Sequence, residues 1–254
     1  MKILLIIQAR TGSTRLPSKV LLNLEGKTVL EQVIRRAKAS KLTTDTLLAT
    51  TISKSDLPIL EICIKNNIQV FCGSENDVLD RFYQSAKLFS PDHIVRITAD
   101  CPIIDPSIID NVIDVHLKQK NDYTSNTLDE TFPDGEDVEV FTFAALKNAW
   151  ENAKLLSERE HVTPFIRNNS EIFKIGNVSC AQNLSNKRWT LDNPEDYEFI
   201  KKVYSELYKQ NELFGMNEVL SLLQKKPELE KINSAITRNL GYIKSVNNDK
   251  EIKK

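Results

Sequence analysis

The sequence predicts an α/β protein built on an open, largely parallel sheet that is covered by helices. In the first half of the chain, short continuous apolar runs alternate with segments whose apolar residues recur every three or four positions. A strand that is buried on both faces shows such a continuous run, because it has no solvent-facing side. A repeated strand–helix order with right-handed crossovers gives a mostly parallel sheet between helices.

Four strand–helix units account for the first 120 residues. The expected strands are 3–7, 46–52, 68–72 and 94–99. Each is followed by a helical stripe, and the stripes run over 29–37, 57–64, 78–89 and 109–116. Thr28 and Glu31 form a capping box that opens the first helix, and Pro106 begins the fourth.

The regular alternation ends after residue 120. We expect short strands at 122–126, 138–141, 173–178 and 188–191, and helices at 143–154, 157–168, 194–210 and 217–233. A capping box of Ser157 and Glu160 is expected to open the second of these helices, and Pro227 to interrupt the last. Residues 1–237 are predicted to form a single domain, and the Asn- and Lys-rich residues 238–254 a loosely held tail.

The composition excludes several classes of partner. The net charge of −1 creates no overall field that would attract nucleic acid or an anionic membrane. No apolar run is long enough to span a bilayer, and the four cysteines lack the spacing of a metal site or a C-x-x-C pair. We therefore expect a cytoplasmic protein that binds neither nucleic acid nor membrane.

A basic loop, QARTGSTRLPSK, follows the first strand. Its Arg10 and Arg15 offer planar forks to phosphate oxygens, and its Lys19 offers a compact charge. Gly12, beside Ser13, lets backbone N–H groups approach an anion. The loop has neither the P-loop nor the dinucleotide fingerprint. It is suited to bind a polyphosphate, and the alternative is a solvated surface loop.

Two carboxylates also fall at strand ends, where an open parallel sheet binds its ligands. Asp100 follows the strand 94–99 and Asp192 follows the strand 188–191. Together with a phosphate-binding loop they suggest a magnesium ion, Mg²⁺, which prefers one or two carboxylates plus substrate phosphates. The alternatives are a turn-forming Asp100 and an Asp192 that caps the helix beginning at Pro194.

Two further polar clusters are ambiguous. His161 lies in the charged segment SEREHVTPF, which is either a solvated first helical turn or a polar wall that faces a substrate. Asp134, Asp137 and Glu139 form an acidic group in PDGEDVEVF, for which an exposed hairpin is the simpler interpretation.

Six segments of the chain resemble a known family. They are similar to the sugar-acid cytidylyltransferases, which include the CMP-sialate and CMP-KDO synthetases, and are most similar to the spore-coat polysaccharide branch. The segments, in the family's order, are QARTGSTRLPSKVL, VFCGSENDVLDRFY, VRITADCPIIDP, PDGEDVEVF, SEREHVTPFIRN and TLDNPEDYEFI. The better-known synthetases begin their signature with a proline where this chain has Gln8. Acceptor-binding residues outside the spore-coat branch do not align cleanly with this chain, which leaves the sugar open.

The resemblance implies a three-layer nucleotide-diphospho-sugar transferase fold, also called glycosyltransferase A-like. It implies that CTP and an acidic sugar give a CMP-sugar and pyrophosphate, with Mg²⁺ on Asp100 and Asp192. Arg10, Arg15 and Lys19 would be the catalytic residues. The implied nucleotide-binding residues are these three together with Ala9, Gly12, Ser13, Cys72, Gly73, Ser74, Asp77 and Asp100.

The implied acceptor side is less sharply defined. Its candidate residues are Asp137, Glu139, Arg159 and His161, of which Arg159 and His161 would bind the acceptor's carboxylate. The expected partners are CTP and a small acidic acceptor. A homodimer is also possible, with residues 127–137 as a contact region. Three alternatives stay open: a phosphonate or polyol phosphate acceptor, a glycosyltransferase that uses a nucleotide sugar, and a nucleotide sensor with a decayed site.

Overall fold

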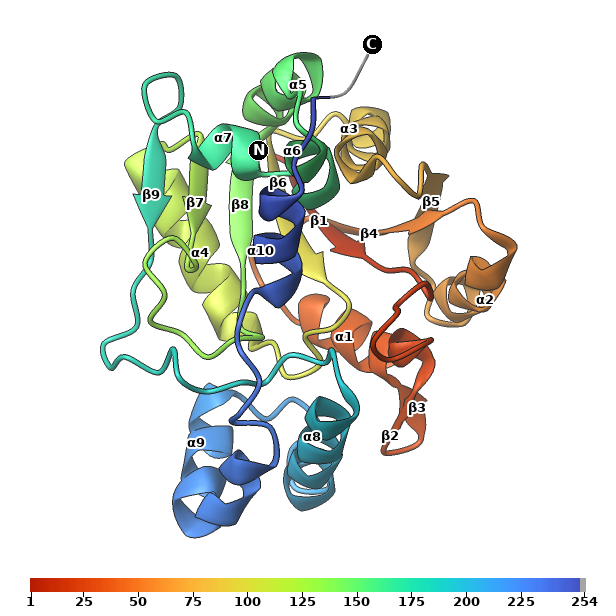
Figure 1. Ribbon diagram of the computed structural model, residues 1–254, viewed down its shortest axis with the longest axis vertical. Coiled ribbons are helices and arrows are strands. Elements are labelled where there is room, and N and C mark those ends of the chain that lie inside the picture. The colour runs from red at the N-terminus through yellow and green to blue at the C-terminus, as the bar shows by residue number, and fades with distance from the viewer. Residues whose placement is uncertain (252–254) are drawn as a thin grey trace.

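The computed structural model describes residues 1–251 and has a seven-stranded sheet at its centre (Figure 1). The strand order is β5-β4-β1-β6-β8-β7-β9. β1 pairs in parallel with β4 and β6, whereas β8 is antiparallel to both of its neighbours. The mostly parallel sheet is therefore confirmed. The strands are β1 (Ile3–Gln8), β4 (Asp45–Thr51), β5 (Gln69–Gly73), β6 (His93–Thr98), β7 (Tyr123–Ser125), β8 (Glu139–Thr142) and β9 (Ile175–Asn177).

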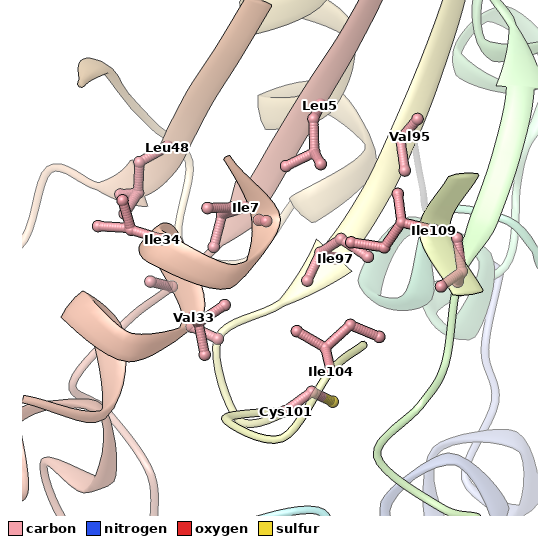
Figure 2. Close-up of a cluster of buried hydrophobic side chains, with 14 of the residues drawn as sticks. Leu5, Ile7, Val33, Ile34, Leu48, Val95, Ile97, Cys101, Ile104 and Ile109 are labelled. Carbon is pink, nitrogen blue, oxygen red and sulfur yellow. The ribbon is translucent and has the colours of Figure 1, made fainter. Parts of the chain in front are cut away.

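Helices cover both faces of the sheet, which confirms the three-layer architecture. One face packs against α1 (Val29–Ala37), α2 (Leu57–Lys65) and α4 (Pro106–Gln119). The other packs against α3 (Val78–Phe89) and α5 (Phe143–Asn152). Figure 2 shows the first of these cores, with Leu5 and Ile7 of β1 facing Val33 and Ile34 of α1.

The Thr28–Glu31 capping box is confirmed. Thr28 accepts from the backbone N–H of Glu31 at 3.1 Å, and the Glu31 carboxylate accepts from the backbone N–H of Thr28 at 2.7 Å. The chain reaches α1 through the short 3-10 helix η1 (Lys19–Leu21) and a small hairpin of β2 (Asn23–Leu24) and β3 (Lys27–Thr28). The sequence analysis predicted none of these three elements.

The predicted helix at 157–168 is wrong in its beginning and its continuity. It is divided into α6 (Leu156–His161) and α7 (Pro164–Arg167), because Val162 adopts a positive φ of 71°. The cap is not made by Ser157 and Glu160. Instead, the Glu158 carboxylate accepts from the backbone N–H groups of Lys154 and Leu155 at 2.8 and 2.9 Å.

The predicted strand at 188–191 is also wrong. Arg188 makes one isolated bridge to Asp134, and the rest of the segment is irregular. It is held by single backbone hydrogen bonds, such as that from Leu191 N–H to the Asp100 carbonyl at 2.8 Å. Its apolar side chains, Trp189 and Leu191, enter a third core with the C-terminal helices instead of a sheet.

The C-terminal third begins with α8 (Pro194–Leu207), α9 (Met216–Lys225) and the 3-10 helix η3 (Pro227–Ile232), so the break at Pro227 is confirmed. Residues 238–251 contain helix α10 (Leu240–Asn247), which Figure 1 shows in dark blue in front of the sheet. How loosely this segment is held in solution stays a prediction. Within residues 1–251, no helix is long and apolar enough to cross a membrane.

Candidate active site

The basic loop follows β1, the strand at which the strand order of the sheet reverses. β1 is flanked by β4, the next strand along the sheet toward one edge, and by β6, which leads toward the other. Ligands bind at such switch points in open α/β sheets. A cavity of about 350 Å³ opens there. Its lining includes Gln8, Ala9, Arg10, Gly12, Ser13, Thr14, Arg15, Lys19, Val20, Val78, Arg96, Thr98, Ala99, Asp100, Glu160, His161 and Asp192.

The start of the loop is anchored by Asp56, a residue that the sequence analysis missed. Thr11 donates to its buried carboxylate from both its backbone N–H, at 2.8 Å, and its hydroxyl, at 2.6 Å. Burial would raise the pKa of Asp56, but hydrogen bonds from Thr11, Thr51 and Thr50 lower it overall. The only signal in the sequence was the motif S-D-L-P, which predicts a helix start and not a contact 45 residues away.

Lys19 is the centre of the loop's charge. Ser18 adopts the left-handed conformation with φ 54°, and the chain turns there into η1. The Lys19 Nζ lies 2.7 Å from Asp100 and 2.8 Å from Asp192, while Arg15 lies 3.0 Å from Asp192. Burial would lower the pKa of Lys19, but the two carboxylates raise it overall. The ammonium is therefore charged at neutral pH.

Asp100 and Asp192 contact the same cation, the Lys19 ammonium, from distant parts of the chain. Asp100 follows β6, and its carbonyl accepts from Leu191 N–H, which places Asp192 beside it. Burial would raise the pKa of Asp100, but Lys19 lowers it to about 2. The cap of α8 is formed by Asn193 and Asp196, so the Asp192 carboxylate does not serve as the cap and instead accepts from Lys19 and Arg15.

The donor set at this point is compatible with magnesium. No group of three or more Asp, Glu, His or Cys residues that could hold a metal occurs among residues 1–251. Two carboxylates that converge on one cation, beside a basic loop, match the preference of Mg²⁺ for few protein ligands and several phosphate oxygens.

Four of the implied nucleotide-binding residues, Cys72, Gly73, Ser74 and Asp77, line neither this cavity nor the second one described below. Cys72 is exposed on the edge strand β5, and the Ser74 hydroxyl accepts from the backbone N–H of Asp77. Asp77 caps α3 and forms an ion pair with Arg159 at 2.5 Å. The segment 72–77 adjoins the basic loop only through Glu75, which lies 3.8 Å from Arg10.

A second cavity of about 450 Å³ adjoins the first. Arg96, Thr98 and His161 line both, so the two cavities meet at these three side chains. The remaining lining residues are Thr127, Leu128, Glu130, Asp137, Glu139, Thr163, Arg167, Asn168, Arg238, Asn239 and Tyr242.

The charges in the second cavity are paired, with one exception. Arg96 forms an ion pair with Glu139, which also accepts from Tyr123 and Thr163. Arg238 forms an ion pair with Asp137 at 2.9 Å. Arg167, in contrast, has no carboxylate within 4.0 Å in the part of the chain that the structure describes, and its guanidinium lies 4.5 Å from the centre of the Tyr242 ring. This cavity therefore offers one arginine to an anionic ligand.

Three of the four predicted acceptor residues lie in this second cavity: Asp137, Glu139 and His161. Arg159 does not, because Asp77 and the Trp150 carbonyl occupy its guanidinium. The lining residues that the sequence analysis missed include four with a charged or aromatic side chain that the argument below uses: Arg96, Arg167, Arg238 and Tyr242.

Two of those four left a signal in the sequence. An arginine within the apolar run IVRIT indicates a buried charge with a partner, and Arg167 ends the segment SEREHVTPFIRN that carries the resemblance. Arg238 and Tyr242 left none, since they lie in the segment that was predicted to be a tail.

A basic loop at the switch point of such a sheet, joined to a second polar cavity, is the arrangement expected of an enzyme that binds a nucleotide. Comparison with known proteins narrows this class. A family model described as cytidylyltransferase matches residues 4–225, and the chain belongs to this family. The predicted resemblance is thereby confirmed.

The most similar relatives and solved structures agree with this family. The chain is 43% identical to an uncharacterized protein of Methanocaldococcus jannaschii, over 93% of this chain and 96% of the relative. It is 33% identical to the spore coat polysaccharide biosynthesis protein SpsF of Bacillus subtilis, over 89% and 95%. The structure of a cytidylyltransferase from Leptospira borgpetersenii superposes with a TM-score of 0.86 at 35% identity, covering 91% of this chain and 97% of that one.

Proposed function

We propose that this protein is a magnesium-dependent cytidylyltransferase that transfers CMP from CTP to an acidic, nonulosonate-like sugar. The observation that carries the proposal is the junction of the two cavities, one lined by the basic loop and the other containing Arg167, which has no carboxylate within 4.0 Å among residues 1–251. The relative named for spore coat polysaccharide biosynthesis supports a place in the synthesis of a surface or spore-coat polysaccharide.

In this proposal the triphosphate of CTP lies along the basic loop. Arg10 is about half exposed and has only a 3.8 Å ion pair with Glu75, so its fork can turn to phosphate oxygens. Gly12 leaves the backbone open to a close approach. Lys19 lies deepest, and its charge would stabilise the α-phosphate and the leaving pyrophosphate in the transition state.

Asp100 and Asp192 would hold the magnesium ion. When bound, it would neutralise charge on the phosphate oxygens, as in phosphoryl transfer generally. The side chains already share the Lys19 ammonium, so two carboxylates and a cation occupy the place where triphosphate charge must be balanced. Lys19 would then turn from the carboxylates toward the phosphates.

The acceptor would bind in the second cavity with its carboxylate on Arg167. Its hydroxyl oxygen then forms a bond to the α-phosphorus while the bond from that phosphorus to the pyrophosphate oxygen breaks. This attack takes place at the junction, near Arg96, Thr98 and His161. The hydroxyl proton leaves to solvent or to a neighbouring side chain. The reaction requires no protein nucleophile.

One assay tests this function. Pyrophosphate release is measured from CTP, UTP, ATP and GTP, with and without Mg²⁺, in the presence of 3-deoxy-manno-octulosonate, N-acetylneuraminate, a phosphonate or a polyol phosphate. Release from CTP alone, requiring Mg²⁺ and a sugar acid, is the expected result. Release only with the phosphonate or polyol phosphate would show that this class, and not a sugar acid, is the acceptor. No release from any pair would overturn it.

A further inference from the structure

The C-terminal segment, residues 238–251, lies outside the region that the family model matches and contributes residues to the second cavity. The family model covers residues 4–225, yet Arg238, Asn239 and Tyr242 line the second cavity. We propose that this segment forms one wall of the acceptor site, and that Tyr242 is a positioning residue that holds Arg167 toward the acceptor's anionic group. The inference rests on the proposed function and adds a residue to it.

The segment is fastened at both of its ends, with Tyr242 between them. At the near end, Arg238 donates to Asp137 at 2.9 Å and to the Phe132 carbonyl at 3.1 Å. At the far end, the Asp249 carboxylate accepts from the backbone N–H of Ser157 at 3.0 Å, and the Lys250 carbonyl accepts from Leu156 N–H at 3.0 Å. These contacts hold α10 in front of the sheet (Figure 1), where Tyr242 lines the second cavity.

Tyr242 contacts two cavity residues at once. The Arg167 guanidinium lies 4.5 Å from its ring centre, and the His161 ring meets it edge to face at 5.0 Å. A guanidinium over an aromatic face is attracted to the ring without losing its hydrogen-bond donors. Tyr242 therefore fixes the direction of Arg167, and no carboxylate among residues 1–251 lies within 4.0 Å of its guanidinium.

The contacts of α10 argue against a purely structural role. None of its residues is buried, and Leu240, Ile243 and Val246 are each more than 40% exposed. A helix that stabilises a fold normally buries an apolar stripe. Its side-chain contacts include a hydrogen bond from Ser245 to Glu160, which lines the first cavity, and the contacts of Tyr242 with Arg167 and His161, which line the second.

The test uses three variants in the full chain: Tyr242→Ala, Tyr242→Phe and, as a matched control on the same helix, Ile243→Ala. Pyrophosphate release is measured against acceptor concentration at saturating CTP, and against CTP at saturating acceptor. We expect Tyr242→Ala to raise the acceptor KM about tenfold, and Tyr242→Phe, which keeps the ring, to stay within about twofold of the parent. The CTP KM is expected to be unchanged in all three variants, as is the acceptor KM of Ile243→Ala.

The other outcomes are distinct. If the acceptor KM of Tyr242→Ala stays within twofold of the parent, or if its CTP KM rises equally, Tyr242 does not position an acceptor ligand and the inference is overturned. The same follows if Tyr242→Phe loses as much as Tyr242→Ala. If the parent protein releases no pyrophosphate with any acceptor, the proposed function fails, and the inference that rests on it fails with it.

Discussion

The two cavities are built in different ways. The first cavity, which we propose binds CTP and call the CTP cavity, is formed largely by segments that follow β1 and β6 of the sheet, and Asp192 joins them from an irregular segment. The second cavity, which we propose binds the acceptor and call the acceptor cavity, takes residues from β6, β8, α6, α7 and the loop between β7 and β8, and the segment around α10 completes it. The first cavity is thus a consequence of topology, and the second depends on particular side-chain contacts.

Their charges are also arranged differently. In the CTP cavity one ammonium is shared by two carboxylates, and Arg15 joins the same group. In the acceptor cavity Arg96 pairs with Glu139, and Arg238 pairs with Glu130, Asp134 and Asp137. Arg167 has no carboxylate within 4.0 Å among residues 1–251. We infer that in the CTP cavity a metal ion can replace the Lys19 ammonium between the two carboxylates, which frees the basic side chains to bind phosphates. In the acceptor cavity, Arg167 can bind a single anionic group.

The largest effect on activity is expected from replacing Lys19. Lys19→Ala removes the charge that both Asp100 and Asp192 contact, and kcat/KM for CTP should fall about a thousandfold. Circular dichroism should show the fold retained, because the side-chain interactions of Lys19 are its ion pairs with Asp100 and Asp192 at the cavity. Lys27→Ala, an exposed lysine of the β2–β3 hairpin, is the control and should retain parent activity. A Lys19→Ala variant with more than a tenth of the parent activity would show that the CTP site lies elsewhere.

The next effect separates two arginines. Arg167→Ala should raise the acceptor KM about 10- to 100-fold, because it removes a charge-assisted hydrogen bond, and leave the CTP KM within about twofold. Arg159→Ala is the comparison, since its guanidinium pairs with Asp77 and lines neither cavity. If initial rates show that Arg159→Ala raises the acceptor KM and Arg167→Ala does not, the original sequence-based assignment of Arg159 holds.

The same contrast explains how much the sequence could predict. The sheet, its helices and the basic loop were predictable because apolar periodicity and strand-end position are local properties. So were Asp100 and Asp192, although the expected strand before Asp192 does not form. The third core explains that error, since Trp189 and Leu191 are apolar because they pack against C-terminal helices and not within a sheet.

The acceptor cavity was less predictable because its contacts join residues far apart in the chain. Arg238 and Asp137 are 101 positions apart, and no local pattern links them. The pairing of Arg159 with Asp77 is similarly invisible, because an arginine within a charged helical turn gives no sign of its partner. The roles of the predicted site residues in binding and catalysis stay predictions.

A moderate effect is expected at the anchor of the basic loop. Thr11→Val removes the hydroxyl that donates to Asp56 and should cost about 1–2 kcal/mol of unfolding free energy at pH 7, with a CTP KM several-fold higher. The pKa of Asp56 is lowered below its ordinary value of 3.8 on folding, so its contribution is present above that pH and is lost as pH falls. Urea unfolding at pH 7 and pH 3 should therefore show a smaller difference from the parent at the acid pH. An equal difference at both values would contradict this role for Asp56.

The smallest effect lies on the acceptor side and concerns Asp137. Burial raises the pKa of this carboxyl to about 7. The negative charges of Asp134, Glu139 and Glu130 add to the rise, and the positive charge of Arg238 opposes it. As pH falls through this range Asp137 takes up a proton and the cavity becomes more positive, and as pH rises its negative charge increasingly repels an acidic acceptor. We expect the acceptor KM to rise about two- to threefold from pH 6 to pH 8 while the CTP KM stays flat.

Asp137→Asn should remove this rise and keep the acceptor KM near its low-pH value, because an amide stays neutral at both pH values. The same raised pKa means that ionisation of Asp137 opposes folding, so the variant should also lose less stability than the parent between pH 6 and pH 8. If the acceptor KM of Asp137→Asn still rises with pH as in the parent, another group titrates in the cavity. His161, whose pKa burial lowers, is then the next to replace. If the CTP KM changes with pH instead, the titrating group acts on CTP binding. The charges of the two cavities would then not be independent of each other.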